Sequence, residues 1–267
     1  MTELVWGSVG QRYFETGIDR GVLYPKVGPG VAWSGLKSIS ENPTGGSPTP
    51  FYADGYKYLN LASAEEFAVT LEAFSAPQEF AVCDGTQGIL NGLFITQQRR
   101  QQFGLAYRTR IGNDEDGAEH GYKLHLVYNA LASASGRNYQ SLSDSSEPAS
   151  LSWQITTTPP EITGYRPSAH FVIDSRYTPK ILLTQFEGML YGTASTDPYL
   201  PTIAQLMAQF NSLVYIQLMK EGMAGLFTVD RVPAIRSVNA PTPAPGQTVL
   251  WLDTSAGYSK LTLVTGE

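Results

Sequence analysis

The alternation of hydrophobic and polar residues is clearest between Gln101 and Ala132, where two segments flank a loop of acidic and turn-forming residues. In the first segment the large apolar side chains occupy alternate positions, namely Phe103, Leu105, Tyr107 and Ile111. The second segment shows the same spacing, with Tyr122, Leu124, Leu126 and Tyr128. A period of two is typical of strands, because successive side chains point to opposite faces. The pattern predicts a long antiparallel hairpin with one face on a core and the other in water.

Similar alternation predicts further strands. Residues 13–24 suit a bent strand, because glycines interrupt the aromatic and branched residues, and 31–41 and 66–74 suit straighter ones. The segment 42–50 is so rich in Gly, Pro, Ser and Thr that we expect an exposed loop. After it, Asp54-Gly55 lies between aromatic residues and predicts the two-residue turn of a hairpin.

The strongest helical pattern runs from Pro179 to Tyr191. Thr178 suits an N-cap, Pro179 the first turn, and Gly192 follows the end. The expected apolar stripe comprises Ile181, Leu182, Phe186, Met189 and Leu190. We also predict a short helix over 77–83 and a second longer one over 201–210. The chain is therefore expected to be mainly β with one or two helices.

The organisation along the chain predicts three parts. Residues 1–228 form the main domain, beginning with an N-terminal arm. Residues 229–247 are proline-rich and suit a stiff linker. Residues 248–267 suit a C-terminal β-hairpin, which is too small to fold alone in water.

Composition excludes several classes of function. Of 267 residues only 16% are charged, and the net charge of −6 argues against a basic surface that grips nucleic acid. The single cysteine, Cys83, allows neither an intramolecular disulfide nor a cysteine-based metal cluster. No stretch approaches the roughly 20 apolar residues of a membrane span, and we expect no signal peptide, no membrane contact and assembly in the cytosol.

Candidate catalytic and metal-binding residues are few. The loop from Asn113 to His120 is acidic, but placing Gly117 at the sixth position of a calcium loop puts Lys123 where a glutamate is required. His120 and His125 are five residues apart with no evident third ligand, and we expect His170 to be a packing residue. No nucleophile elbow, zinc-protease motif or phosphate loop occurs. We expect no catalytic residue, no metal and no cofactor.

Longer segments carry a resemblance. FGLAYRTRIGND, HGYKLHLVYNALASASGRNY and SWQITTTPPEITGYRPSAHFVIDS, in that order, resemble the major tail proteins (tail tube subunits) of long-tailed, siphovirus-like bacteriophages. Upstream, YFETGIDRGVLYP and GVAWSGLKSISENPTGG are also similar, so the resemblance spans roughly Val9 to Phe210.

The resemblance implies a tail-tube β-sandwich or barrel fold, with sheets joining between subunits into a continuous inner barrel. It implies a structural virion protein, not an enzyme, that forms stacked, hexameric rings whose lumen conducts genomic DNA. The implied partners are other copies of the chain, a tape measure protein inside the tube, tail-tip and tail-terminator proteins, and double-stranded DNA in transit. The implied location is the virion tail, after assembly in the host cytoplasm.

Two sets of residues follow as candidates. The expected lumen-facing residues are Glu66, Thr70, Glu72, Arg108, Arg110, Lys123 and His125. Because a basic wall would bind DNA, we expect the cations among them to pair with carboxylates across strands or between subunits. The long loop, about 42–58, and the acidic hairpin tip are expected to contact neighbouring subunits or rings, through Asn42, Pro43, Gly45, Gly46, Pro48, Asp54, Gly55, Asp114, Glu115 and Asp116.

Two other functions remain open from sequence. The 15 tyrosines and 4 tryptophans would suit a carbohydrate-binding β-sandwich, with Trp251 or Tyr258 stacking on a sugar. A glycan-cleaving enzyme of the tail would need two carboxylates in one cleft.

Overall fold

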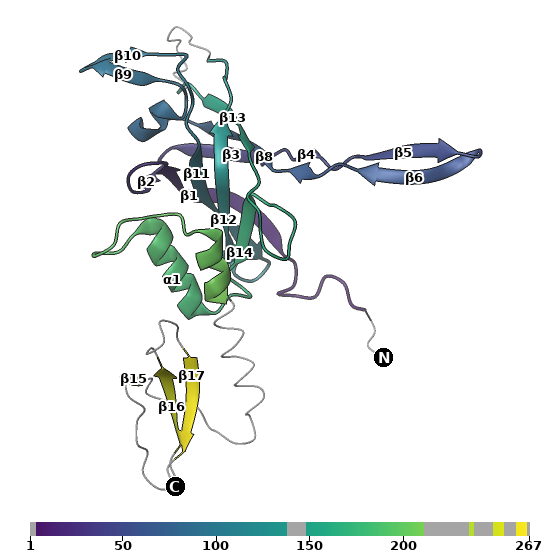
Figure 1. Ribbon diagram of the computed structural model, residues 1–267, viewed down its shortest axis with the longest axis vertical. Helices are drawn as coiled ribbons and strands as arrows, with labels where there is room; N and C mark the ends of the chain where they lie inside the picture. The colour runs from purple at the N-terminus through teal and green to yellow at the C-terminus, as the bar shows by residue number, and fades with distance from the viewer. Residues whose placement is uncertain (1–3, 138–147, 211–234, 238–247, 254–259, 266–267) are drawn as a thin grey trace. The chain divides into compact units, whose positions relative to one another are not determined.

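The computed structural model of this protein describes residues 4–137, 148–210, 235–237, 248–253 and 260–265 (Figure 1). The chain divides into two compact units, Met1–Met207 and Ala208–Glu267. The described secondary structure is mainly β with helices near the end of the first unit, which confirms the predicted class.

An eight-stranded sheet forms the body of the first unit. Its hydrogen-bonded path runs β2-β1-β11-β12-β13-β8-β3, and β14 pairs with β12 off this path. The bounds are β1 Phe14–Pro25, β2 Val31–Ala32, β3 Leu36–Glu41, β8 Ala68–Ala73, β11 Phe103–Asn113, β12 Gly117–Ala132, β13 Leu151–Thr157 and β14 His170–Asp174. Strand β12 is long enough to pair with β14 through Lys123–Val127 and with β13 through Ala130–Ala132.

The predicted hairpin of residues 101–132 is confirmed as β11 and β12. Its turn is held by the Asn113 side chain, whose Oδ1 accepts hydrogen bonds from the backbone N–H groups of Glu115 (3.2 Å) and Asp116 (2.6 Å). Near its other end, a register shift coincides with Asn129, which has φ +49°. Such a bulge bends a strand, and here it lies just before β12 changes partner.

One face of the sheet encloses the main core. Trp33, Phe80 and Trp153 pack together at its centre, with ring centroids 4.6–5.8 Å apart. Around them lie Leu23, Val69, Leu71, Ala73, Cys83, Phe103, Leu105, Tyr107, Val127, Ala130, Ala132 and Ile155. Phe80 enters from a short 3-10 helix, η1 Gln78–Val82, which confirms the helix expected there.

The opposite face of the sheet is also covered. The prediction that one face of the central hairpin lies in water is therefore wrong. Leu105 pairs with Val127 and Ala106 with Leu126, so the apolar residues predicted in the two arms project to opposite faces. Leu124, Leu126 and Tyr128 are buried on the second face. Helix α1, Lys180–Tyr191, is bonded to β1, where the Tyr24 hydroxyl donates to the carbonyl of Leu190 (2.8 Å) and the Arg20 guanidinium lies 3.9 Å from the Glu187 carboxylate.

Helix α1 starts one residue later than predicted. Pro179, not Thr178, occupies the N-cap position, and no side chain caps the helix start. The buried stripe is Leu182, Leu183, Phe186 and Leu190, whereas Ile181 is exposed. The predicted second helix is present at residues 203–210, where Thr202 and Gln205 form a reciprocal capping box.

Three two-stranded pairs extend from this body: β4 Thr44–Gly45 with β7 Glu65–Glu66, β5 Pro48–Ala53 with β6 Tyr56–Ala62, and β9 Gln87–Leu90 with β10 Leu93–Ile95. Figure 1 shows β5 and β6 projecting far from the sheet. The exposed loop expected over 42–50 is therefore partly strand, although it is exposed as expected.

In the second unit, β16 Thr248–Asp253 pairs antiparallel with β17 Lys260–Thr265 and parallel with β15 Ile235–Ser237. Strand β15 lies within the proline-rich segment 229–247, and the remainder of that segment is outside the described residues.

Candidate assembly surfaces

The long hairpin of β5 and β6 is exposed along its whole length. Phe51 lies opposite Leu59 and Thr49 opposite Leu61, so three large apolar side chains share one face. Their exposed fractions are 49% for Phe51, 46% for Leu59 and 56% for Leu61. A two-stranded hairpin is marginally stable on its own in water, so this geometry favours contact with another molecule.

Two local features shape the hairpin. At its tip Asp54 (φ +53°) and Gly55 (φ +81°) both have left-handed backbone, as a two-residue primed turn requires, which confirms the predicted turn. At its base Gly45 (φ +79°) pairs with Glu65, and a Cβ at Gly45 would lie 2.3 Å from the Ala64 carbonyl oxygen. A side chain at this position would clash with the backbone, so this exit of the hairpin from the sheet requires glycine.

The remaining loop candidates lie around the same base. The Asn42 amide donates to the carbonyl of Ser40 (3.1 Å) and to Thr70 Oγ1 (3.2 Å), which ties the first residue after β3 to β8. Gly46 donates its N–H to Ser63 Oγ (3.2 Å), while Pro43 and Pro48 are exposed.

A second exposed apolar surface lies on the hairpin of β9 and β10, which the sequence did not single out. It carries Ile89, Leu90, Leu93, Phe94 and Ile95, all at least 42% exposed. Contiguous exposed apolar residues commonly mark an interface.

The expected lumen residues of β8 lie on a polar sheet face. Thr70 and Glu72 alternate with the buried Val69 and Leu71. Across the pairs with β3 and β13, the same face carries Ser38, Ser40, Ser152 and Gln154. Glu72 lies 3.5 Å from Lys37, and Glu66 lies outside this sheet, exposed on β7.

Arg108 and Arg110 lie on the face covered by α1 and converge on Asp19 of β1. The Arg108 guanidinium donates two hydrogen bonds to the Asp19 carboxylate (2.6 and 2.7 Å), and Arg110 donates two more (3.0 Å each). These bonds hold the pKa of the Asp19 carboxyl below its usual range. The expected cross-strand pairing of these two cations is therefore present.

Lys123 and His125 lie on the opposite face from the arginines, so the hairpin candidates do not form one surface. Lys123 is paired with Glu15 of β1. His125 is buried, and its Nδ1 is 3.0 Å from Nε2 of His170. Burial is the largest cause lowering the pKa of His125, to about 4.

At the acidic tip of the central hairpin, Asp114 holds the N-terminal arm. Its carboxylate accepts hydrogen bonds from the N–H groups of Gly10 (3.0 Å) and Arg12 (3.3 Å). Asp116 lies 2.8 Å from His120, and Glu115 is exposed. Asp114 and Asp116 therefore make contacts within the chain, in addition to any contact with another subunit.

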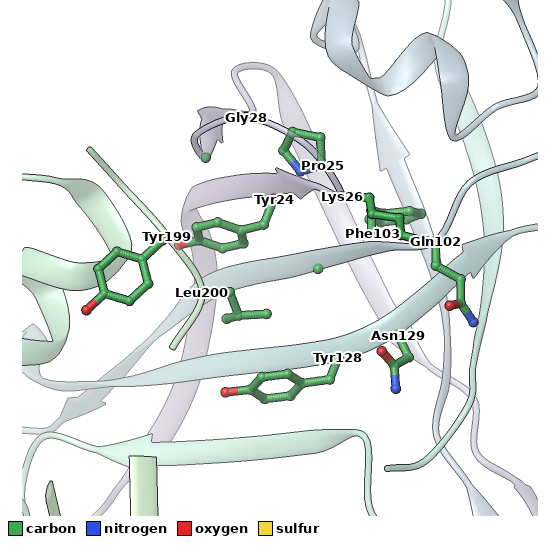
Figure 2. Close-up of a pocket in the computed structure, with 12 residues that line it drawn as sticks. Tyr24, Pro25, Lys26, Gly28, Gln102, Phe103, Tyr128, Asn129, Tyr199 and Leu200 are labelled. Carbon is green, nitrogen blue, oxygen red and sulfur yellow. The ribbon is translucent and has the colours of Figure 1, made fainter. Parts of the chain in front are cut away.

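A groove of about 350 Å³ lies between β1, the bulge of β12 and the segment before residues 203–210 (Figure 2). Its lining includes Lys26 as the only charged residue. Two lining tyrosines are buried with their hydroxyls bonded to backbone carbonyls, Tyr24 to Leu190 and Tyr128 to Pro201. Its described lining residues include no carboxylate pair, which glycan hydrolysis would need, and Tyr199, 38% exposed, is an aromatic side chain open to solvent there.

The sequence also offered Trp251 and Tyr258 for sugar stacking. Tyr258 lies outside the described residues, and Trp251 belongs to β16. No helix in the described part of the chain has the length and apolar character needed to cross a bilayer.

One cluster of functional groups was missed from the sequence. Glu41, His125 and His170 come from β3, β12 and β14, and their ligand atoms lie within 4.8 Å of one another. Nothing in their sequence spacing signals this, because 84 positions separate Glu41 from His125 and 45 separate His125 from His170. Only the pairing of β12 with β14 and the curvature of the sheet bring them together.

No protein family model matches this sequence, and no curated protein does. Among solved structures, similarity is found to a chain of the anti-feeding prophage baseplate, at 10% identity over 64% of this chain and 97% of that one, with a TM-score of 0.33. Similarity is also found to the anti-feeding prophage tube-terminating cap (11% identity, 66% and 97% covered, TM-score 0.30). A third similarity is to the sheath-tube complex of an extracellular contractile injection system, PVC (12% identity, 58% and 88% covered, TM-score 0.30).

Proposed function

We propose that this protein is the structural subunit of a bacteriophage tail tube, forming stacked hexameric rings that conduct DNA. The observation that carries the proposal is the β5–β6 hairpin, which projects from the body and presents Phe51, Leu59 and Leu61 to solvent. A second copy of the chain is the expected partner, as the resemblance of residues 9–210 to major tail proteins implies. The tape measure, tail-tip and tail-terminator proteins are the further partners that this function requires.

The edges of the sheet support ring formation. Within the described residues β3 pairs only with β8, and β14 only with β12. Unpaired backbone at an edge strand is a template for another strand, and closing sheets between subunits removes such edges. A ring in which these sheets join would form one continuous barrel.

The polar face of β3, β8 and β13 is the surface we assign to the lumen. It is rich in hydroxyl and amide groups, and its carboxylate Glu72 is paired with Lys37. Such a wall would release few counterions from passing DNA and would therefore not bind it tightly. In a density map of the assembled tube, Thr70 and Gln154 should line the bore, and a bore lined by Arg108 would contradict this assignment.

The test of the tube is assembly of the purified chain at high concentration, followed by negative-stain microscopy and sedimentation. The variant Phe51→Ser/Leu59→Ser/Leu61→Ser removes the apolar face of the hairpin. Completing the burial of three half-exposed side chains is worth about 1 kcal/mol each. We therefore expect the concentration needed for assembly to rise by about a hundredfold.

The matched control is Val27→Ser/Ile181→Ser, which removes apolar side chains that are 85% and 72% exposed elsewhere on the first unit. It should assemble like the wild type. Assembly of the triple variant at wild-type concentrations would overturn the role of the hairpin. A wild-type chain that forms no rings, alone or with a tail-tip complex, would overturn the tube itself.

A further inference from the structure

The cluster of Glu41, His125 and His170 has the composition of a transition-metal site. His125 Nδ1 lies 3.0 Å from His170 Nε2 and 3.6 Å from Glu41 Oε1. Zinc bound by histidine nitrogen and carboxylate oxygen at about 2.0–2.1 Å places tetrahedral ligands about 3.3–3.4 Å apart. These two separations lie on either side of that spacing, and the ligand atoms of Glu41 and His170 lie within 4.8 Å of each other, so side-chain shifts alone suffice to admit an ion.

We propose that Glu41, His125 and His170 bind a divalent transition metal, with Zn²⁺ as the first choice and water as the fourth ligand. Two neutral imidazoles and one carboxylate are the donor set that Zn²⁺ takes in open sites. The Glu41 side chain is 43% exposed, which gives the ion and its water a path from solvent. This inference does not depend on the proposed tail function.

The surroundings hold both imidazoles in place. The Tyr107 ring stacks on His125 (centroids 4.5 Å apart, planes at 8°), and Phe67 stacks on His170 (4.0 Å, 25°). The Tyr107 hydroxyl donates to Glu41 Oε1 (2.8 Å), which draws the carboxylate toward the histidines. Ligands that are already oriented lose less freedom when an ion binds.

Thr109 suits the role of an outer partner. Its Oγ1 is 3.0 Å from Nε2 of His125, the ring nitrogen that faces away from His170. When Nδ1 of His125 binds an ion, Nε2 carries the proton and donates a hydrogen bond to the hydroxyl. Without an ion, Nδ1–H can donate to His170, and the Thr109 hydroxyl then donates to Nε2. One hydroxyl serves both states without any backbone change.

Burial affects both histidines. It is the main cause lowering the pKa of His125 and of His170 below the ordinary value, and Glu41 opposes it in both. Lys123, the other charged group facing His125, lowers the pKa of His125 further.

The experiment is zinc titration of the full chain, freed of metal by chelator, followed by calorimetry and by thermal unfolding. We expect one saturable Zn²⁺ per chain and a rise in Tm of about 5–10 °C at a hundredfold excess over Kd. Co²⁺ should bind with the intense visible absorption of a tetrahedral site containing histidine. Glu41→Gln, at a half-exposed position, should weaken Zn²⁺ binding at least tenfold, and His170→Gln should abolish it.

The matched control is His120→Gln, because His120 is the only histidine of this chain outside the cluster. It should bind Zn²⁺ like the wild type. If His170→Gln fails to fold, the comparison of Glu41→Gln with His120→Gln and the Co²⁺ spectrum still decide the question. No saturable binding by the wild type, equal binding by Glu41→Gln, or loss of binding in His120→Gln would each overturn the site.

Discussion

Replacing Asp19 by Asn tests how far the paired charges under α1 stabilise the sheet. Asp19 accepts four hydrogen bonds from Arg108 and Arg110, and its side chain is 26% exposed. An asparagine has the same size but keeps only one acceptor oxygen and carries no charge. The substitution therefore removes the carboxylate that the two guanidinium groups share, and leaves Arg110 with the exposed Glu119, 3.9 Å away, as an acidic partner.

The magnitude lies between two limits. Breaking a fully buried pair costs about 3–5 kcal/mol, whereas exposed pairs contribute about 0–1 kcal/mol. The Arg108 side chain is 14% exposed and that of Arg110 is 42%, so we place the loss in the free energy of unfolding at about 2 kcal/mol. For a domain of this size it corresponds to a fall in Tm of about 4–8 °C.

The assay is urea denaturation of wild type, Asp19→Asn and the control Glu72→Gln at several pH values. Glu72 pairs with Lys37 across exposed side chains, so the control should lose less than about 0.5 kcal/mol. Because the arginines lower the native pKa of Asp19, its stabilisation is complete above the unfolded value of about 3.9 and is lost as pH falls through the native value. Equal losses in the two variants at pH 7, or a difference that persists unchanged below pH 2, would refute this reasoning.

Two further predictions concern the core. Phe80→Ala should lower the free energy of unfolding by about 3–5 kcal/mol, because Phe80 is 1% exposed and contacts Trp33, Phe103 and Trp153. The control is Val82→Ala at an exposed position nearby, which should lower it by less than about 0.5 kcal/mol. Similar losses in the two variants, measured by urea denaturation, would contradict the prediction. The Cys83 thiol should be unreactive toward a thiol reagent at pH 8 until the chain unfolds, since it is fully buried and burial raises its pKa to about 11; rapid labelling of the folded chain would contradict this.

The sequence predicted individual strands well because their signals are local. The central hairpin, the Asp54-Gly55 turn and the helices each follow from alternation, turn chemistry or a nearby proline and glycine. The N-cap of α1 was placed wrongly because Thr178 and Pro179 both suit a helix start, and sequence cannot rank them.

The faces of the central hairpin could not be predicted, because they depend on register. Alternation fixes which residues of one strand share a face, but not which face of the partner strand lies beside them. The turn at Asn113 and Gly117 pairs Leu105 with Val127, so the larger apolar residues of the two arms point apart. Both sides of the hairpin consequently need cover, and α1 supplies it for the second side.

The same register explains why the expected lumen-facing residues of β11 and β12 lie on opposite faces of the sheet. Arg108 and Lys123 are both polar positions in alternating strands, yet the first lies under α1 and the second on the opposite face. The sequence predicted that both cations pair with carboxylates, because a buried or half-buried cation requires a partner, and both pair with acids of β1. The sequence could not identify Asp19 and Glu15 as the partners, because their positions depend on the pairing of β1 with β11.

The cluster of Glu41, His125 and His170 connects the core to the proposed assembly surface. Glu41 is the last residue of β3, and the next residue begins the segment that leads into the β5–β6 hairpin. The Tyr107 hydroxyl holds Glu41 against the sheet, and Asn42 is bonded to Thr70, so the hairpin leaves the body from an anchored strand end. A long projecting hairpin contacts a neighbouring subunit at a defined place only if its base is rigid. An ion held by Glu41, His125 and His170 would tie that base to two further strands, and it would stabilise the direction of the hairpin without touching the hairpin itself.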